Sequence, residues 1–242
     1  MGLITVTGIV TRYANYRDSD RILTIFTDEA GIISASARGC RKTNSQLLAS
    51  SELFVYGEFV LFKNKDKYTI NACDIRESFY PLREDMDRFS AAMFMLELIN
   101  HGSNTGEGAH AHVQQLYYAL SYTAYADVHP LDMAICFAIR YLASLGFCPA
   151  LTYCVKCGAD LRASSTIIFD VAAGGAVCDG CAGMGIRVSA TAMEALRRMM
   201  MLSDQETRRV KLPERVRLEL KTIIKKYADF VLECELKAID QL

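Results

Sequence analysis

Ile4-Thr-Val-Thr-Gly-Ile-Val-Thr11 is a stretch in which two sets of residues alternate: Ile4, Val6, Gly8 and Val10 with Thr5, Thr7, Ile9 and Thr11. This period of two residues is typical of a β-strand whose two faces differ. Further strands are expected at residues 21–27, 31–37, 53–63 and 68–75. Asp28-Glu-Ala-Gly31 and Lys63-Asn-Lys-Asp66 have the composition of turns between them. Five strands in about eighty residues predict a small antiparallel unit that fits an OB-like barrel, although an open sheet or an SH3-like barrel would give the same pattern.

After residue 80 the apolar period becomes helical. Phe89, Ala92, Met93, Leu96 and Ile99 share one face and predict a helix over residues 83–100. Two more helices are expected at 113–126 and 130–145, separated from the first by a Gly-rich loop over 101–112.

Two later helices are predicted from their first residues. Thr191-Ala-Met-Glu194 has the form of a capping box for a helix that ends at Leu202. Pro213 suits the start of a final helix, whose apolar face comprises Val216, Leu220, Ile223, Tyr227 and Phe230. The expected fold class is α+β and multidomain: an OB-like barrel over 1–80, then a helical domain over 81–242 with an insert at about 150–185.

The insert contains four of the nine cysteines. Because no export signal is visible, the thiols should be reduced, and paired spacing then indicates a metal site. Cys154 and Cys157 form one CxxC pair, Cys178 and Cys181 form the other, and twenty residues separate the pairs. This spacing predicts one structural Zn²⁺ with four cysteine ligands and no open position for catalysis. Unrelated thiols and a thioredoxin-like redox motif are the alternatives.

Basic side chains gather in two places although the net charge is −1. In the β-rich part the cations are Arg12, Arg17, Arg21, Arg38, Arg41 and Lys42. Tyrosines lie among the first three, and cations beside aromatic rings are what a groove for single-stranded nucleic acid requires. Toward the C-terminus a second basic face comprises Arg197, Arg198, Arg208, Arg209 and Lys211. Ordinary solvated faces and tyrosines of a barrel core are the alternatives.

The sequence lacks the common signatures of enzymes. It contains no GxxxxGK[ST] loop, no GxGxxG after a strand, no GxSxG and no HExxH. His101, His110 and His112 lie in the Gly-rich loop without a carboxylate pair, and Glu84-Asp-Met-Asp87 suits the first turn of a helix. No membrane span or signal peptide is visible, so a cytoplasmic protein that is not an enzyme is expected.

The residues also resemble a known family, that of the DNA repair protein RecO. The resemblance covers essentially the whole chain and rests on several short motifs. These are Gly8-Ile-Val10, Tyr16-Arg-Asp-Ser-Asp-Arg-Ile-Leu-Thr-Ile-Phe-Thr27, Gly31-Ile-Ile-Ser-Ala-Ser-Ala-Arg-Gly-Cys-Arg-Lys42, Ser78-Phe79 with Leu82-Arg-Glu-Asp85, and Leu145-Gly-Phe-Cys-Pro149 before Cys154.

The resemblance implies an N-terminal OB fold, a helical C-terminal domain and an inserted zinc finger. It implies binding of single- and double-stranded DNA, annealing of strands coated with single-stranded-DNA-binding protein, and loading of RecA together with RecR, with RecF and RecA as indirect partners. The family's basic patch maps onto Arg38, Arg41 and Lys42, and Cys40 departs from its pattern. A zinc-ribbon transcription regulator or protein adaptor without annealing activity is the alternative.

Overall fold

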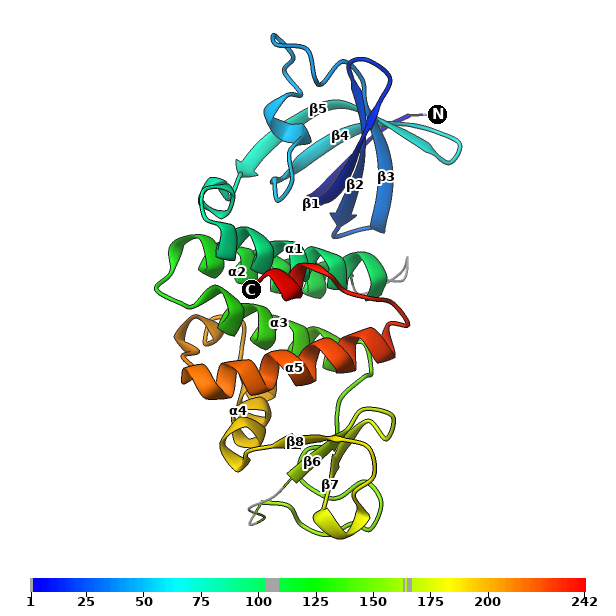
Figure 1. Ribbon diagram of the computed structural model, residues 1–242. Coiled ribbons are helices and arrows are strands. Elements are labelled where there is room, and N and C mark those ends of the chain that lie inside the picture. The colour runs from blue at the N-terminus through cyan, green and yellow to red at the C-terminus, as the bar shows by residue number, and fades with distance from the viewer. Residues whose placement is uncertain (1, 103–108, 163, 165–166) are drawn as a thin grey trace.

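The computed structural model describes residues 2–102, 109–162, 164 and 167–242. Three parts follow one another along the long axis of the molecule (Figure 1): a barrel at one end, a layer of helices in the middle and a small three-stranded sheet at the other end. None of the described helices is long and apolar enough to cross a membrane.

The barrel consists of the five strands that the sequence predicts. They are β1 (Gly2–Tyr16), β2 (Asp20–Thr27), β3 (Gly31–Ala37), β4 (Tyr56–Asn64) and β5 (Lys67–Glu77). β1 is longer than expected because its first half pairs with β4 and its second half with β2, across an irregularity between Val10 and Arg12. The ring closes in the order β1-β2-β3-β5-β4. One pair, β3 with β5, is parallel, so the purely antiparallel expectation was wrong at this point.

The alternating side chains of these strands fill the barrel. Residues such as Val6, Val10, Leu23 and Phe59 are buried in a core of their own. Cys40, which follows β3, is also fully buried in this core. Its thiol therefore acts as a small apolar side chain and not as an exposed reactive group.

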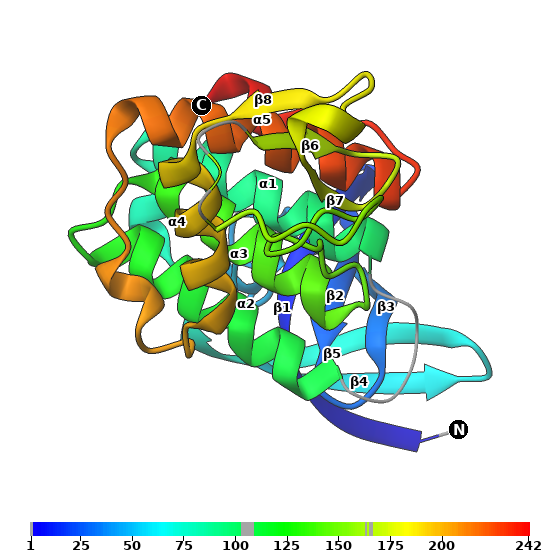
Figure 2. The same ribbon diagram turned by 90° about the horizontal axis from the view of Figure 1, so that it is seen from below.

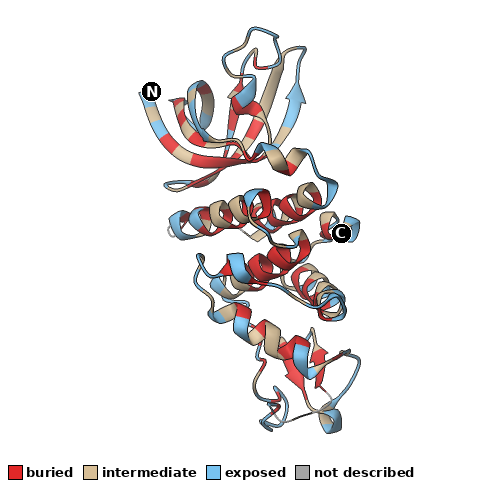
Figure 3. Cartoon of the chain, turned by 90° about the vertical axis from the view of Figure 1, so that its left-hand side faces the viewer, coloured by how far each residue is buried: buried red, intermediate tan, exposed pale blue. Residues whose placement is uncertain are grey.

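Five α-helices follow the barrel in the described residues. They are α1 (Met86–Gly102), α2 (Ala109–Tyr125), α3 (Pro130–Ser144), α4 (Ala190–Met201) and α5 (Glu214–Val231). α3 lies between α1 and α2 on one side and α4 and α5 on the other, and nearly all of it is buried (Figure 3). The expected helices are present. The loop predicted over 101–112 was wrong at its two ends, because residues 101–102 belong to α1 and residues 109–112 belong to α2. Residues 103–108 lie outside the described part of the chain.

Two details of the helix ends and faces differ from the predictions. The N-cap of α4 is Ser189, whose Oγ accepts a hydrogen bond from Ala192 N–H at 3.2 Å, so the capping box predicted at Thr191 was wrong. Phe230 belongs to the predicted apolar face of α5 but is 53% exposed.

A buried ion pair joins α3 to α5. The Oδ1 atom of Asp132 accepts from Arg217 Nε at 2.6 Å, and its Oδ2 atom accepts from Leu212 N–H at 2.9 Å. Asp132 is only 1% exposed. Since both carboxylate oxygens have donors, the buried charge is compensated.

The barrel and the helices share a packed junction. Ile9, Phe26 and Phe54 belong to the core that runs through the helices. Thr11 Oγ1 donates to Asn100 Oδ1 at 2.8 Å. These contacts fix the barrel against α1.

The C-terminal half of α1 also binds a segment that is distant in sequence. The Oε2 atom of Glu97 accepts hydrogen bonds from the N–H groups of Lys237 and Ala238, both at 3.0 Å. This contact brings the short 3-10 helix Ala238–Gln241 against α1.

Glu77 stabilises the chain where β5 leaves the barrel. Its Oε1 atom accepts from Ser78 N–H, Phe79 N–H and Tyr125 Oη, at 2.8, 2.9 and 2.9 Å. Burial by itself would raise the pKa of Glu77, but these hydrogen bonds outweigh it and lower the pKa. The ionised carboxylate is therefore the form that holds the junction.

Replacing Glu77 by Gln is expected to lower the free energy of unfolding by about 1–2 kcal/mol at neutral pH, because charge-assisted hydrogen bonds are lost. Because the pKa of Glu77 is lowered in the folded state, the wild type loses the stability that the ionised carboxylate contributes as the pH falls. The difference in free energy of unfolding between the wild type and Glu77→Gln should therefore shrink toward about pH 3. Urea unfolding at several pH values measures it. Glu84→Gln, at an exposed acid of the same region, is the control, and an equal or pH-independent loss in both variants would contradict the assignment.

Candidate functional site

The four predicted metal ligands lie together. The Sγ atoms of Cys154, Cys157, Cys178 and Cys181 are all within 4.8 Å of one another. Cys157 Sγ and Cys178 Sγ are 3.7 Å apart, which matches the spacing of about 3.8 Å that a tetrahedral zinc with bonds of about 2.3 Å imposes on its sulfurs. In the described residues this is the one group of His, Cys, Asp or Glu side chains suited to a metal ion.

The electrostatics of the cluster also favour a cation. Backbone N–H groups, that of Cys178 first, lower the pKa of Cys154 to about 6. Hydrogen bonding with Cys157 and Cys178 raises the pKa of Cys181 to about 12. Four thiolates at this spacing repel one another, so a positive charge between them would stabilise the deprotonated cluster, and the donor set suits a Zn²⁺ ion.

The cluster is held by a small sheet of the strands β6 (Ile167–Asp170), β7 (Gly175–Val177) and β8 (Ile186–Val188). Gly175 is required because a Cβ atom there would lie 2.4 Å from the carbonyl oxygen of Ala150. The sheet packs on the helices, as the edge-on contact of Phe169 with Tyr227 of α5 illustrates. Figure 2, viewed from this end, shows the sheet in front of the helices.

Arg197, a residue of the second basic face, connects two segments of the fold. Its guanidinium is 17% exposed and donates from Nε to the carbonyl oxygen of Leu151 at 3.0 Å. It thereby ties the cysteine-bearing segment to α4.

Residues 38–42, called the basic loop below, follow β3 at the end of the barrel that points away from the helices (Figure 1). They carry three exposed cations: Arg38, Arg41 and Lys42. The loop lies against the turn between β1 and β2, because Arg41 N–H donates to the carbonyl oxygen of Ser19 at 2.9 Å. Arg17, in that turn, is exposed as well. The structure thus brings together cations that are more than twenty residues apart in sequence.

The other two barrel cations differ from this group. Arg21 is largely buried, with a side chain 12% exposed. Its guanidinium bonds Glu52 Oε1 at 2.7 Å and lies 4.0 Å from the ring centroid of Tyr13. Arg12 is exposed on β1, opposite Thr24. Arg21 is therefore occupied by contacts within the barrel, unlike the exposed cations of the basic loop.

Sequence reasoning missed three lysines of the barrel. Lys63, Lys65 and Lys67 are exposed in the hairpin between β4 and β5. The parallel pairing of β3 with β5 brings the start of β5 beside the last residues of β3, just before the basic loop. The alternation Lys-Asn-Lys-Asp-Lys was the available signal, but its acid and amide were interpreted only as a turn.

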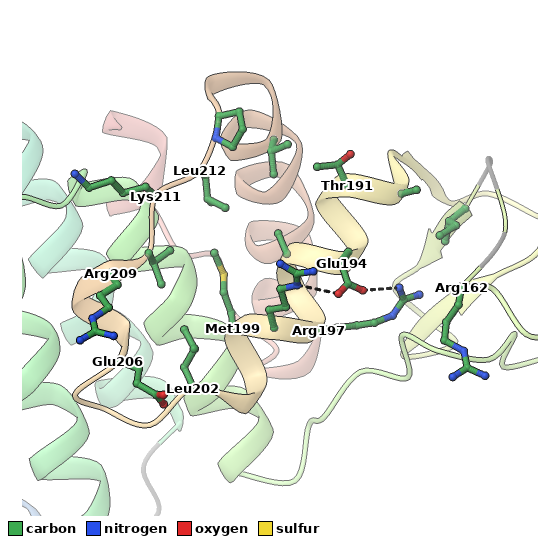
Figure 4. A pocket seen from close by; sticks show the side chains of 17 residues that line it. Arg162, Thr191, Glu194, Arg197, Met199, Leu202, Glu206, Arg209, Lys211 and Leu212 are labelled. Carbon is green, nitrogen blue, oxygen red and sulfur yellow. Dashed lines mark hydrogen bonds and ion pairs between the residues drawn. The ribbon is translucent and has the colours of Figure 1, made fainter.

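A groove of about 900 Å³ runs between α4 and the start of α5. Its apolar lining includes Ile167, Met199, Leu202, Val210, Leu212 and Val216. Figure 4 shows Arg209 and Lys211 on one side of the groove and Arg162 on the other. Glu194, between them, is bonded to Arg197 and Arg198.

The second basic face is therefore divided. Arg198, Arg209 and Lys211 line the groove, and Arg197 lines it while tying down the metal-binding segment. Arg208 is exposed and lies near Tyr122 of α2. The helical layer separates this groove from the basic loop (Figure 1).

The histidines do not form a common site. His110 Nδ1 lies 3.3 Å from Asp28 Oδ2 of the barrel. His112 Nε2 lies 2.9 Å from Ser144 Oγ, and burial lowers the pKa of His112. These contacts join elements of the fold.

The chain combines a closed five-stranded barrel carrying a loop of exposed cations, a layer of helices and a four-cysteine cluster that could hold a metal ion, but a fold of this class does not by itself define a function. The comparisons with known proteins make the class specific. The chain belongs to the recombination protein O family of DNA repair proteins: the model of the family's N-terminal part matches residues 1–79, and that of its C-terminal part matches residues 83–238.

Relatives that carry the name DNA repair protein RecO align over most of their length. That of Acetivibrio thermocellus is 37% identical over 181 residues, which cover 75% of this chain and 71% of the relative. That of Alkaliphilus metalliredigens is 31% identical, over 93% of this chain and 92% of the relative. That of Caldicellulosiruptor saccharolyticus is 29% identical, over 99% and 98%.

Proposed function

We propose that this chain is a DNA-binding recombination mediator. It binds single- and double-stranded DNA, anneals complementary strands and, with RecR, helps to load RecA onto strands coated with single-stranded-DNA-binding protein. The observation that carries the proposal is the cluster of exposed cations on the basic loop and the neighbouring turn at the free end of the barrel. RecF and RecA are indirect partners in this proposal, and the protein acts at the bacterial nucleoid.

The barrel supports an OB assignment for residues 1–80. Its five strands close in the order β1-β2-β3-β5-β4, and five-stranded OB barrels bind oligonucleotides along one face and through the loops beside it. The corresponding positions here are the turn between β1 and β2, which carries Arg17, and the β4–β5 hairpin. The basic loop lies against that turn, because Arg41 N–H donates to the carbonyl oxygen of Ser19. The helical domain then takes up residues 81–242, with the zinc finger at about 150–185.

The net charge of −1 does not argue against DNA binding, because the charge near the basic loop differs from that of the whole chain. Two of the acidic side chains near the basic loop are engaged: Asp20 accepts from Gly39 N–H at 2.7 Å, and Glu52 pairs with Arg21. Arg38 and Lys42 are exposed cations. DNA affinity depends on the cations that meet phosphates more than on the charge of the whole chain.

Annealing in this proposal needs no covalent chemistry. Two polyanionic strands must approach while their bases stay available, and cations reduce the repulsion between phosphates. Because four thiolates saturate it, the zinc would stabilise the fold and take no part in a reaction. The protein would therefore act without being an enzyme.

The groove is the proposed site for the C-terminal tail of single-stranded-DNA-binding protein. An acidic peptide with apolar residues suits an apolar floor with cations on its rim. Since the helices separate the groove from the basic loop (Figure 1), we assign both DNA strands to the barrel and the protein tail to the groove.

Replacing Arg209 by Ala is expected to weaken binding of a labelled peptide with the sequence of that tail by about three- to tenfold, because a rim charge is removed. Fluorescence anisotropy measures it. Arg215→Ala removes the same charge from an 87% exposed side chain outside the groove and should change little. Equal effects of the two variants would contradict the assignment.

The test of the whole proposal is strand annealing on DNA coated with single-stranded-DNA-binding protein, with and without RecR and at two salt concentrations. We expect annealing that weakens as salt rises. A protein adaptor, the alternative function, would bind its partners but leave bare DNA unbound even in dilute buffer, and that outcome would replace the proposal.

A further inference from the structure

The acidic residues of the β1–β2 turn would ordinarily be expected to oppose DNA binding. Asp18 and Asp20 lie beside the cations of the basic loop, and a negative charge near a phosphate-binding surface repels the ligand. Their contacts, however, differ. Asp18 is exposed and contributes only its carbonyl oxygen, which accepts from Arg41 Nη1 at 3.2 Å.

Asp20 uses its carboxylate to hold the loop. Its Oδ1 atom accepts a hydrogen bond from the backbone N–H of Gly39 at 2.7 Å, which is short for an N–H donor. Gly39 has a φ of +64°, a conformation that side-chain-bearing residues rarely adopt. The bond therefore fixes the backbone at the turn that separates Arg38 from Arg41.

The next residue of β2 fixes the other end of the same connection. The Nη1 atom of Arg21 donates to the carbonyl oxygen of Ser51 at 2.9 Å and pairs with Glu52. Between these two anchors Cys40 is buried in the barrel core. Asp20 and Arg21, which are consecutive in sequence, thus hold the two ends of the connection between β3 and β4.

We infer that Asp20 is a positioning residue for DNA binding, which it supports despite its negative charge. This inference rests on the proposed function of the barrel. A held backbone presents Arg38, Arg41 and Lys42 in one arrangement, so that less conformational entropy is lost when they meet phosphates. Asp18 has no such role and only repels the strand.

The inference predicts opposite effects of two substitutions that remove the same charge. Asp20→Ala should bind a labelled single-stranded oligonucleotide about tenfold more weakly, since a charge-assisted hydrogen bond is lost. Asp18→Ala should bind about twofold more tightly, since only a repulsion is removed. Asp20→Asn keeps an oxygen acceptor for Gly39 N–H and should stay within about twofold of Asp18→Ala.

A double-mutant cycle separates positioning from a general effect on the fold. In a chain with Arg38, Arg41 and Lys42 replaced by alanine, Asp20→Ala should no longer weaken binding, because the cations that it positions are absent. Should that triple variant bind as the wild type does, the proposed function of the basic loop fails. If the triple variant is weak but Asp20→Ala binds as tightly as Asp18→Ala, the proposed function stands and the inference is wrong.

A second variant covers the case in which Asp20→Ala does not fold. Gly39→Ala changes no charge, and its Cβ would meet nothing closer than 3.8 Å, but it strains the left-handed turn. It should weaken DNA binding by about two- to fivefold while Asp20→Asn does not. Equal binding by these two variants would overturn the inference.

Discussion

Cys178→Ser is expected to abolish the stoichiometric zinc content of the purified protein and to loosen residues 150–188. Binding of a structural zinc contributes on the order of 10 kcal/mol to the folding of a small finger. The cysteine-bearing segment depends on this contribution because its sheet consists of three strands of three or four residues each. Metal analysis and amide hydrogen exchange over these residues measure the effect.

The loosening should also reach α4 and α5, because Ile167, Phe169 and Val188 belong to the same core as these helices. The midpoint of thermal unfolding should therefore fall. Cys148→Ser removes an exposed thiol outside the cluster and is the matched control. Retention of zinc by Cys178→Ser, or equal loss in both variants, would refute the four-cysteine assignment.

The triple variant Arg38→Ala, Arg41→Ala, Lys42→Ala is expected to bind single-stranded DNA about 30- to 100-fold more weakly at low salt. Each phosphate contact contributes through counterion release, so the slope of log K against log salt should become shallower by about two for three lost contacts. The loss should be similar for all sequences, because phosphates carry no base information. A salt titration followed by anisotropy gives both quantities.

The control for this variant removes three exposed cations elsewhere: Arg187, Arg215 and Lys226. Arg187 lies on β8, at the other end of the molecule, and Arg215 and Lys226 lie on α5, on the side of the helical layer that is away from the barrel (Figure 1). Since screening limits charge effects to about 10 Å, binding should change by less than about threefold. An equal loss of affinity in both triple variants would show that net charge, and not the basic loop, governs the interaction.

Regular elements could be predicted because their signals are local. The alternation over residues 4–11 and the face shared by Phe89, Met93 and Leu96 indicate a strand and a helix whatever the rest of the chain does. The two CxxC pairs likewise place four ligands at one point. Pairing was harder, since nothing in residues 31–37 or 68–75 indicates that β3 and β5 run parallel.

The roles of single charges could not be predicted, because they depend on partners that are distant in sequence. Arg21 is thirty-one residues from Glu52, and Arg197 is forty-six residues from Leu151. In the sequence, nothing distinguishes Arg21 or Arg197 from the exposed arginines near it. The cap at Ser189 was missed because Thr191-Ala-Met-Glu194 fits the capping box, whereas Ala192, three residues after Ser189, does not.

The two hydrogen bonds from the backbone of Lys237 and Ala238 to Glu97 affect the order in which parts of the chain can fold during synthesis. A ribosome must synthesise about 140 further residues after Glu97 before these donors exist. The strands of the barrel, by contrast, find all their pairing partners within residues 2–77. We therefore expect the barrel to fold on the nascent chain while α1 stays incomplete, so that a stalled or truncated product would expose apolar helix surface and be a preferred substrate for chaperones and proteases.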